Sequence, residues 1–319
     1  MKKITVFAII LILGLIVCTN NKASAQDEAK GFSITPFFRE VVLSENSRVE
    51  KFELEVVNSR DFPAVFRISA LDFGSLNETS GVAFAGSQDL NSKYNLASWI
   101  SLERDAIVLA PGEKQIVRGT VENKEVLSPG GHYAAVVFKM ENDGNDAMSN
   151  VDLRPSVASL IFVRKMGGEI YGLNLKEHSI ARSFWGLPTA VRLRFQNTGN
   201  VHLSPRGTVK VADMLGREVR RGIINEESSL ILPETFRVFP TNLRNFVIAF
   251  IPGMYNIAID YRYDGEEGFM TQQQQIFVVP MAFNIFFLIV VSIIGVYFGI
   301  RYKLKSNAKT NKHKKYQKN

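Results

Sequence analysis

Two long apolar runs, one near each end of the chain, most constrain what this sequence can fold into. The run from residue 276 to 300 carries no charged side chain. A helix needs roughly 20 apolar residues to cross the hydrocarbon core of a bilayer. The tail at 301–319 holds eight basic residues and no acidic one, which favours the cytoplasmic side. We therefore predict a membrane-spanning helix at 277–300 followed by a basic cytoplasmic tail.

The first apolar run has the features of an export signal. Lys2 and Lys3 precede the run, and small residues ending at Ala25 offer a signal-peptidase site before Gln26. Lipidation at Cys18 is the alternative, but a β-branched valine precedes that cysteine, where small residues are the rule. We predict a signal peptide at 1–25 that is cleaved between Ala25 and Gln26. The chain is then a single-pass protein of the cell membrane, with its N-terminal part outside.

Charge and cysteine content have to be taken for the exported part alone. Of the 38 basic residues, 11 lie in the signal or the tail, which leaves 27 against 31 acidic residues. A net acidic ectodomain has no charge basis for binding polyanions, so we expect no nucleic-acid partner. Cys18, the only cysteine, leaves with the signal. Folding outside the cell must therefore rest on apolar burial without disulfides.

The exported part alternates apolar and polar residues nearly throughout, as in Phe52, Leu54 and Val56. Such alternation is typical of half-buried strands, and Pro-Gly and Asn-Gly turns recur between the runs. Antiparallel sandwiches follow from this pattern. With room for two cores, we predict an all-β fold of two tandem immunoglobulin-like β-sandwiches at 26–165 and 166–276, plus the C-terminal membrane helix.

An internal repeat supports two domains. The segment from Leu109 to Tyr133 matches the segment from Ile231 to Tyr255 at the same spacing, and a strand ending in asparagine precedes each segment, at Asn58 and at Asn197. The first copy is longer between its asparagine and its proline, and the Ser-, Asn- and Gly-rich stretch 75–95 is the candidate insertion. Both tyrosines follow a Pro-Gly turn, where the ring can enter the core while the hydroxyl bonds to backbone.

The sequence offers little for catalysis. His132, His178 and His202 are scattered and are expected to be surface or turn residues rather than metal ligands. We predict no enzyme activity, no catalytic or metal-ligating residues and no cofactor. The acidic stretch 141–152 lacks the spacing of an EF-hand, and a solvated hairpin loop is the preferred interpretation, with calcium left open. The candidate contact residues are Phe184 and Trp185, which fall between strands.

The order of several segments resembles a known family. FSITP, ASWISLERDAIVLAPGE, PGGHYAAVVF and QNTGNVHLSPRG occur in sequence before the membrane helix and basic tail, an order similar to that of the WxL-interacting proteins of Gram-positive bacteria. The resemblance covers nearly the whole chain. It implies two immunoglobulin-like ectodomains, the first associated with peptidoglycan and the second with protein partners. It also implies no enzyme activity.

The function expected from the sequence is a membrane-anchored adhesion or scaffold protein at the cell surface. Its partners are expected to be surface proteins, peptidoglycan or both, in addition to the bilayer around its helix. The alternative is an extracytoplasmic chaperone that lends a strand to an incomplete fibre or pilus subunit. A free, apolar edge strand in the first domain favours the chaperone, whereas a blocked edge opposes it.

Overall fold

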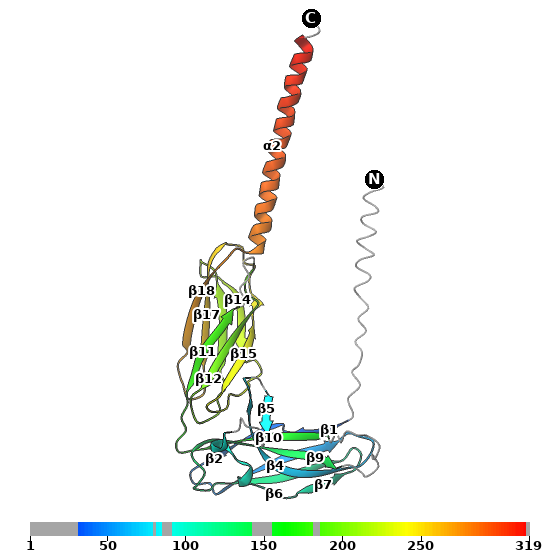
Figure 1. Ribbon diagram of the computed structural model, residues 1–319, viewed down its shortest axis with the longest axis vertical. Helices are drawn as coiled ribbons and strands as arrows, with labels where there is room; N and C mark the ends of the chain where they lie inside the picture. Colours follow the sequence, from blue (N-terminus) through cyan, green and yellow to red (C-terminus); the bar gives the residue numbers. More distant parts are fainter. Residues whose placement is uncertain (1–30, 79–80, 85–90, 142–154, 181–185, 317–319) are drawn as a thin grey trace.

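The protein is mostly β-structure with one long C-terminal helix (Figure 1). The computed structural model describes residues 31–78, 81–84, 91–141, 155–180 and 186–316, with side chains up to residue 302. The strands of the N-terminal half are β1 (Phe32–Thr35), β2 (Phe38–Leu43), β3 (Val49–Asn58), β4 (Ala64–Leu76), β5 (Gly81–Phe84), β6 (Ile100–Leu102), β7 (Ala106–Leu109), β8 (Lys114–Glu122), β9 (Gly130–Glu141) and β10 (Ser156–Lys165). Those of the C-terminal half are β11 (Leu173–Ile180), β12 (Ala190–Asn197), β13 (Arg206–Ala212), β14 (Glu218–Ile224), β15 (Phe236–Asn242), β16 (Arg244–Asn245), β17 (Gly253–Arg262) and β18 (Met270–Val278).

The strands of the N-terminal half form two facing sheets, which we call the first sandwich. One sheet has the order β1-β3-β8-β6, and the other has the order β2-β10-β9-β4-β5 with β7 also paired to β4. Their inner side chains bury one common core that includes Phe52, Leu54 and Val56 from one sheet and Phe66 and Phe138 from the other. The predicted alternation of β3 is thus confirmed, because every second residue from Phe52 to Asn58 is buried.

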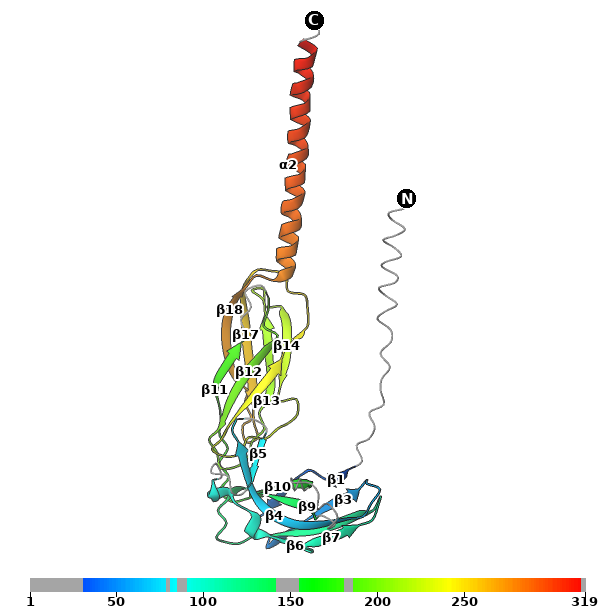
Figure 2. The same cartoon turned by 45° about the vertical axis from the view of Figure 1, so that its right-hand side comes forward.

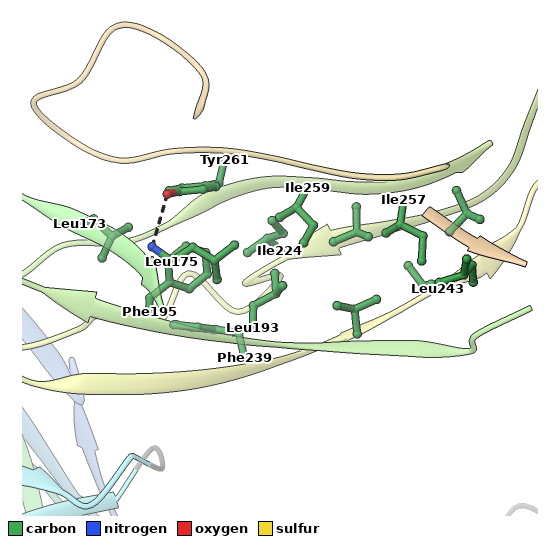
Figure 3. Close-up of a cluster of buried hydrophobic side chains, with 14 of the residues drawn as sticks. Leu173, Leu175, Leu193, Phe195, Ile224, Phe239, Leu243, Ile257, Ile259 and Tyr261 are labelled. Carbon is green, nitrogen blue, oxygen red and sulfur yellow. Dashed lines mark hydrogen bonds between the residues drawn. The ribbon is translucent and has the colours of Figure 1, made fainter. Parts of the chain in front are cut away.

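The strands of the C-terminal half form the second sandwich in the same way. Its sheets have the orders β11-β12-β15 and β16-β14-β13-β17-β18. Leu193 and Phe195 of β12 face Ile257 and Ile259 of β17 across the core (Figure 3). The hydroxyl of Tyr261 accepts a hydrogen bond from the backbone N–H of Leu175 at 3.3 Å. Even this buried polar atom is therefore paired.

The internal repeat is visible as repeated hydrogen bonding. The buried amide of Asn58 donates to the carbonyl of Leu109 at 3.1 Å, and the buried amide of Asn197 donates to the carbonyl of Ile231 at 2.9 Å. Leu109 and Ile231 are the two residues that the sequence alignment places in register. In each sandwich the asparagine ends one strand and fixes the turn that leads into that strand's neighbour, β8 or β15. The sequence repeat therefore corresponds to the same hydrogen-bonded turn in both sandwiches.

The helix α2 (Met281–Tyr316) begins later than the sequence predicts. Ile276 and Val278, assigned to the end of the second domain and to the membrane helix, belong to β18 and are buried in the second core. Within the described residues one stretch, Met281–Tyr302, is long and apolar enough to cross a membrane. At 1.5 Å per residue its 22 residues extend over about 33 Å. The helix also continues through most of the basic tail.

The second sandwich lies between the first sandwich and the helix (Figure 1). The strands of the first sandwich run across the long axis of the molecule, whereas those of the second sandwich and α2 run along that axis. The chain crosses from β10 to β11 through residues 166–172. One end of the second sandwich therefore meets the first sandwich, and the opposite end carries the helix.

Candidate partner-binding cleft between the two sandwiches

Two segments singled out in the sequence, PGGHY and NTGNVH, meet where the sandwiches join. The N–H of Gly131 donates to the carbonyl of Asn200 at 2.7 Å. The side-chain amide of Asn200 donates to the carbonyls of Gly168 at 2.9 Å and Pro129 at 3.3 Å. A turn of each sandwich is thus bonded to the other and to the connecting segment.

The glycines of the PGGHY segment are required by this contact. Gly130 has a φ of +119°, a backbone conformation that favours glycine. A Cβ atom added at Gly130 would lie 2.7 Å from the carbonyl oxygen of Asn200, and one added at Gly131 would overlap the hydroxyl of Tyr133. These positions lack side chains because the second sandwich and a buried tyrosine occupy the space.

Tyr133 and Tyr255, equivalent in the repeat, use their hydroxyls differently. Tyr255 donates to the carbonyl of Ile251 at 2.6 Å, which is the local backbone bond expected from the sequence. The hydroxyl of Tyr133 lies 3.3 Å from Nδ1 of His202 in the second sandwich. Burial raises the pKa of Tyr133 well above its ordinary value, so the phenol is neutral. The prediction that each ring enters the core is confirmed for both tyrosines; the hydroxyl of Tyr255 bonds to nearby backbone, whereas that of Tyr133 reaches the second sandwich.

A carboxylate continues this contact to the surface. Nε2 of His202 lies 3.4 Å from Oε1 of Glu40 in β2, and Arg164 of β10 pairs with the same carboxylate at 3.0 Å. The hydrogen bond from His202 lowers the pKa of Glu40, and the charges of His202 and Arg164 act in the same direction. Aromatic rings surround the imidazole, with Phe162 at 5.2 Å and Tyr133 at 5.7 Å between ring centroids.

The candidate insertion 75–95 supplies a second set of contacts. Figure 2 shows β5 and the end of β4 rising from the first sandwich toward the second. The guanidinium of Arg194 in β12 donates to the carboxylate of Glu78 at 2.8 Å. Glu234 accepts hydrogen bonds from Lys93 at 2.8 Å and from the hydroxyl of Tyr94 at 2.7 Å. The insertion is therefore a brace between the sandwiches, a role that its composition did not indicate.

Beside these contacts lies an apolar cleft of about 470 Å³. Its walls come from both sandwiches, and the apolar side chains among its lining residues are Phe37, Phe38, Phe73, Val82, Leu160, Phe162, Leu230, Ile231, Leu232 and Phe236. Phe37, immediately before β2, is 73% exposed. Large exposed aromatic side chains next to a concave apolar surface are typical of protein contact sites. The cleft exists only while both sandwiches keep their relative position.

The second wall of the cleft is a loop with a fixed shape. Asn225 has a φ of +58°, and its side-chain amide donates to the carbonyls of Pro205 at 3.1 Å and Ser229 at 2.9 Å. The carbonyl of Ile231 is bonded to Asn197, and its N–H is bonded to Leu203. Leu230 and Leu232 flank Ile231 and pack against the aromatic cluster of the first sandwich.

Strand β2, next to the cleft, is paired along one edge and open along the other. β2 pairs in parallel with β10 from Phe38–Leu160 to Leu43–Lys165. This pairing blocks the edge that β10 would otherwise present. β2 is then the outermost strand of its sheet in the described residues, and it begins next to Phe37 at the mouth of the cleft. An extended segment could add to β2 and place a side chain in the cleft.

The residues proposed from sequence are distributed differently. The candidate contact pair Phe184 and Trp185, the cleavage pair Ala25 and Gln26, and residues 142–152 of the acidic stretch all lie outside the described residues. Within the part that is described, no group of three or more His, Cys, Asp and Glu side chains could hold a metal ion.

The expectation that the histidines are surface or turn residues is wrong for His132, whereas His202 lies in the turn segment between β12 and β13 but is not on the surface. His132 is buried, its Nε2 lies 2.8 Å from the carbonyl of Ser128, and burial lowers its pKa. His202 is enclosed in the contact described above, with only 6% of its side chain exposed. His178 lies on β11 and pairs with the side chain of Gln274 at 2.8 Å. No local pattern indicated that His202 would meet Tyr133, because the two residues are 69 positions apart.

Fold and site together define a β-sandwich protein with a cleft between its two sandwiches and one helix suited to crossing a membrane. No family model matches the chain, and no curated protein matches it.

Several solved structures have a similar outline. The crystal structure of the class 5 fimbriae chaperone CfaA shares 11% identity over 76% of this chain and 99% of that chain, with a TM-score of 0.38. The E. coli chaperone DraB shares 15% identity over 78% and 96% of the two chains, with a TM-score of 0.35. A chain from the complex of the Salmonella enterica SafA pilin with the SafB chaperone shares 9% over 79% and 99%, with a TM-score of 0.38.

Proposed function

We propose that this protein is a non-enzymatic adhesion or scaffold protein, anchored in the cell membrane by α2, that holds a partner surface protein at the cleft between its sandwiches. The observation that carries the proposal is the apolar cleft itself, which has one wall from each sandwich and an exposed aromatic residue, Phe37, at its mouth. In this proposal the two sandwiches are tandem immunoglobulin-like domains outside the cell, and the tail of α2 is cytoplasmic.

The contacts at the junction support a binding role for the cleft. Glu78 with Arg194, Glu234 with Tyr94, and Tyr133 with His202 join the sandwiches at separate points. A cleft whose walls are already positioned loses little conformational freedom when a partner binds, so more of the contact energy appears as affinity. Anchoring in the membrane raises the effective concentration of the cleft near other envelope proteins.

The resemblance to WxL-interacting proteins supports the same proposal. It assigns peptidoglycan to the first domain and protein partners to the second domain. The cleft is lined by both domains, so a protein held there would also contact the part that the resemblance assigns to the cell wall. Peptidoglycan binding is part of the proposal on the basis of this resemblance alone.

The alternative is a chaperone that lends a strand to an incomplete subunit. Strand donation from β10 is opposed by the structure, since β2 covers its edge from Leu160 to Lys165. The open edge of β2 next to Phe37 keeps the alternative in consideration, because an unassembled subunit could pair there. Both functions use the cleft, and they differ in whether the partner stays.

The test is site-specific photocrosslinking in living cells. A photoreactive amino acid replaces Phe37 at the cleft in the full-length chain, and the control replaces Val126, which is 86% exposed on the first sandwich and does not line the cleft. The expected result is an adduct with one surface protein at position 37 and none at position 126. Mass spectrometry identifies the partner, and sugar analysis of the purified chain detects bound wall polymer.

The outcomes separate the two functions. An adduct with a protein in its mature surface assembly that persists through a chase supports the scaffold. An adduct with an unassembled subunit that disappears during the chase supports the chaperone. If position 37 gives the same pattern as position 126, the cleft is not the partner site and the proposal is wrong.

A further inference from the structure

The end of the second sandwich that carries the helix is unusually apolar. The loop between β16 and β17 exposes Phe246, Val247, Ile248 and Phe250, and Ile248 is 79% exposed. The turn between β13 and β14 exposes Met214 and Leu215. We call these six residues the apolar end. Exposed apolar side chains occur singly on most proteins, but a contiguous group marks a surface that is covered in use.

Strand register places both segments at the end next to the helix. Ala212, which ends β13, pairs with Asn256 near the start of β17, and Gly253 at that start pairs with Val278 at the end of β18. The turn after β13, the loop before β17 and the exit of β18 toward α2 are therefore neighbours. Figure 1 shows the helix leaving from this end, opposite to the first sandwich.

The apolar end is continuous with the helix. The ring of Phe250 lies 6.0 Å from that of Phe283 and 5.7 Å from that of Phe286, both in α2. Val247 and Ile248 line a pocket of about 230 Å³ together with Met281. Phe286 is five residues beyond Met281, which corresponds to about 7.5 Å along the helix axis. Phe250 therefore lies beside the first turns of the apolar segment Met281–Tyr302.

We propose that the apolar end is a membrane-docking surface that inserts into the lipid leaflet where α2 enters the bilayer. If Met281–Tyr302 crosses the hydrocarbon core, its length of about 33 Å matches the roughly 30 Å thickness of that core and leaves little freedom of depth. Phe250 must then lie at the border between headgroups and acyl chains. The exposed loop residues next to it lie in the same layer, where aromatic and aliphatic side chains are favoured.

This inference goes beyond the anchoring role of the helix. A single helix alone would leave the sandwiches free to swing over the membrane surface. With the apolar end inserted, the second sandwich has two attachments to the bilayer and a fixed tilt. The first sandwich and the cleft are then held at a fixed height above the lipid.

The test measures the depth of the loop in lipid. Single-cysteine variants of the full-length chain are made in a Cys18→Ser background and labelled with an environment-sensitive fluorophore. The positions are Ile248→Cys and Leu215→Cys at the apolar end, and Val126→Cys on the first sandwich as the control. The labelled chains are reconstituted into phosphatidylcholine nanodiscs with or without lipids that carry a spin label near the top of the acyl chain.

The expected result is strong quenching by spin-labelled lipid at positions 248 and 215, clearly greater than at position 126, with a blue-shifted emission. Equal quenching at all three positions would overturn the proposal. Emission that is blue-shifted at position 248 but insensitive to the lipid quencher would also overturn it, because a second copy of the chain would then cover the surface. The use of two positions on separate segments protects the result against local misfolding of one variant.

Discussion

Replacement of Asn197 by alanine should destabilise the second sandwich selectively. The buried amide of Asn197 donates to the carbonyls of Val201 at 2.7 Å and Ile231 at 2.9 Å, and its oxygen accepts from the N–H of Gly199 at 2.9 Å. Each bond contributes roughly 1 kcal/mol net, so the loss of all three costs about 3 kcal/mol. The two carbonyls and the N–H stay buried without these partners, which makes this a lower bound.

Hydrogen exchange measured by mass spectrometry can locate this loss. A change of about 3 kcal/mol corresponds to a decrease in protection of more than roughly a hundredfold. We expect the decrease in peptides from β12 and β15, while peptides from β3 and β8 of the first sandwich keep most of their protection. The matched control is Asn174→Ala, on the neighbouring strand β11, because that side chain is exposed.

Two results would refute the reasoning. A loss below about 1 kcal/mol would mean that the three hydrogen bonds are replaced by other partners or water in the variant. An equal loss of protection in both sandwiches would mean that the junction makes them a single cooperative unit. In the second case the asparagine would still be important, but the two cores would not be separately stable.

Three further predictions concern the end of the second sandwich and the junction of the two sandwiches. A chain truncated after Pro280 should be secreted and folded, whereas truncation four residues earlier removes buried Val278 and should lower stability by about 2 kcal/mol, measured by urea denaturation. The pKa of Glu40 is lowered in the folded state, so its ionised form stabilises the protein. This stabilisation is complete above the ordinary glutamate pKa and is lost as pH falls through the lowered value. Between about pH 7 and about pH 3, the melting temperature should therefore fall less in Glu40→Gln than in wild type. Gly131→Ala should lower the melting temperature by several degrees, consistent with a loss of about 1–3 kcal/mol. Gly268→Ala is the control, because its added Cβ meets only an ordinary contact, and it should leave the melting temperature unchanged. Equal melting temperatures for the two variants would show that the junction accommodates the added methyl group without a loss of stability.

The sequence predicts the strands well because their chemistry is local. Alternation of apolar and polar residues follows directly from the pleat of a strand that has one face in a core. The repeat could be recognised from sequence for a similar reason, because Asn58 and Asn197 form the same hydrogen bond at the same place in each sandwich. Patterns that depend on neighbours in sequence, or on one strand and its turn, are preserved in the residue order.

The start of the helix was mispredicted because the local signal is absent there. Ile276 and Val278 are buried while Phe277 between them is exposed, which is the alternation of a strand. All three residues are apolar, so nothing in their composition separates the last strand from the membrane run that follows. The distinction is made by the pairing of β18 with β17, which lies outside the run itself.

The candidate cleft could not be found from sequence for a similar reason. Its two walls are held side by side by contacts such as Glu78 with Arg194 and Tyr133 with His202, which join residues 116 and 69 positions apart. The stretch 75–95 looked like a polar excursion because it is rich in Ser, Asn and Gly. The signal that could have indicated its role is the presence of Val82 and Tyr94 within it, two apolar residues that an unattached loop has no reason to contain.

The position of β18 determines how this protein would respond to being pulled. β18 is hydrogen-bonded only to β17 among the described strands, over nine residue pairs, and it leads almost directly into the helix. Tension between a partner on the first sandwich and the membrane would act along β18, parallel to its length. All nine pairs would then bear the load together in shear, instead of opening one after another like a zipper. The geometry suits a chain that has to resist a pull between its first sandwich and its helix.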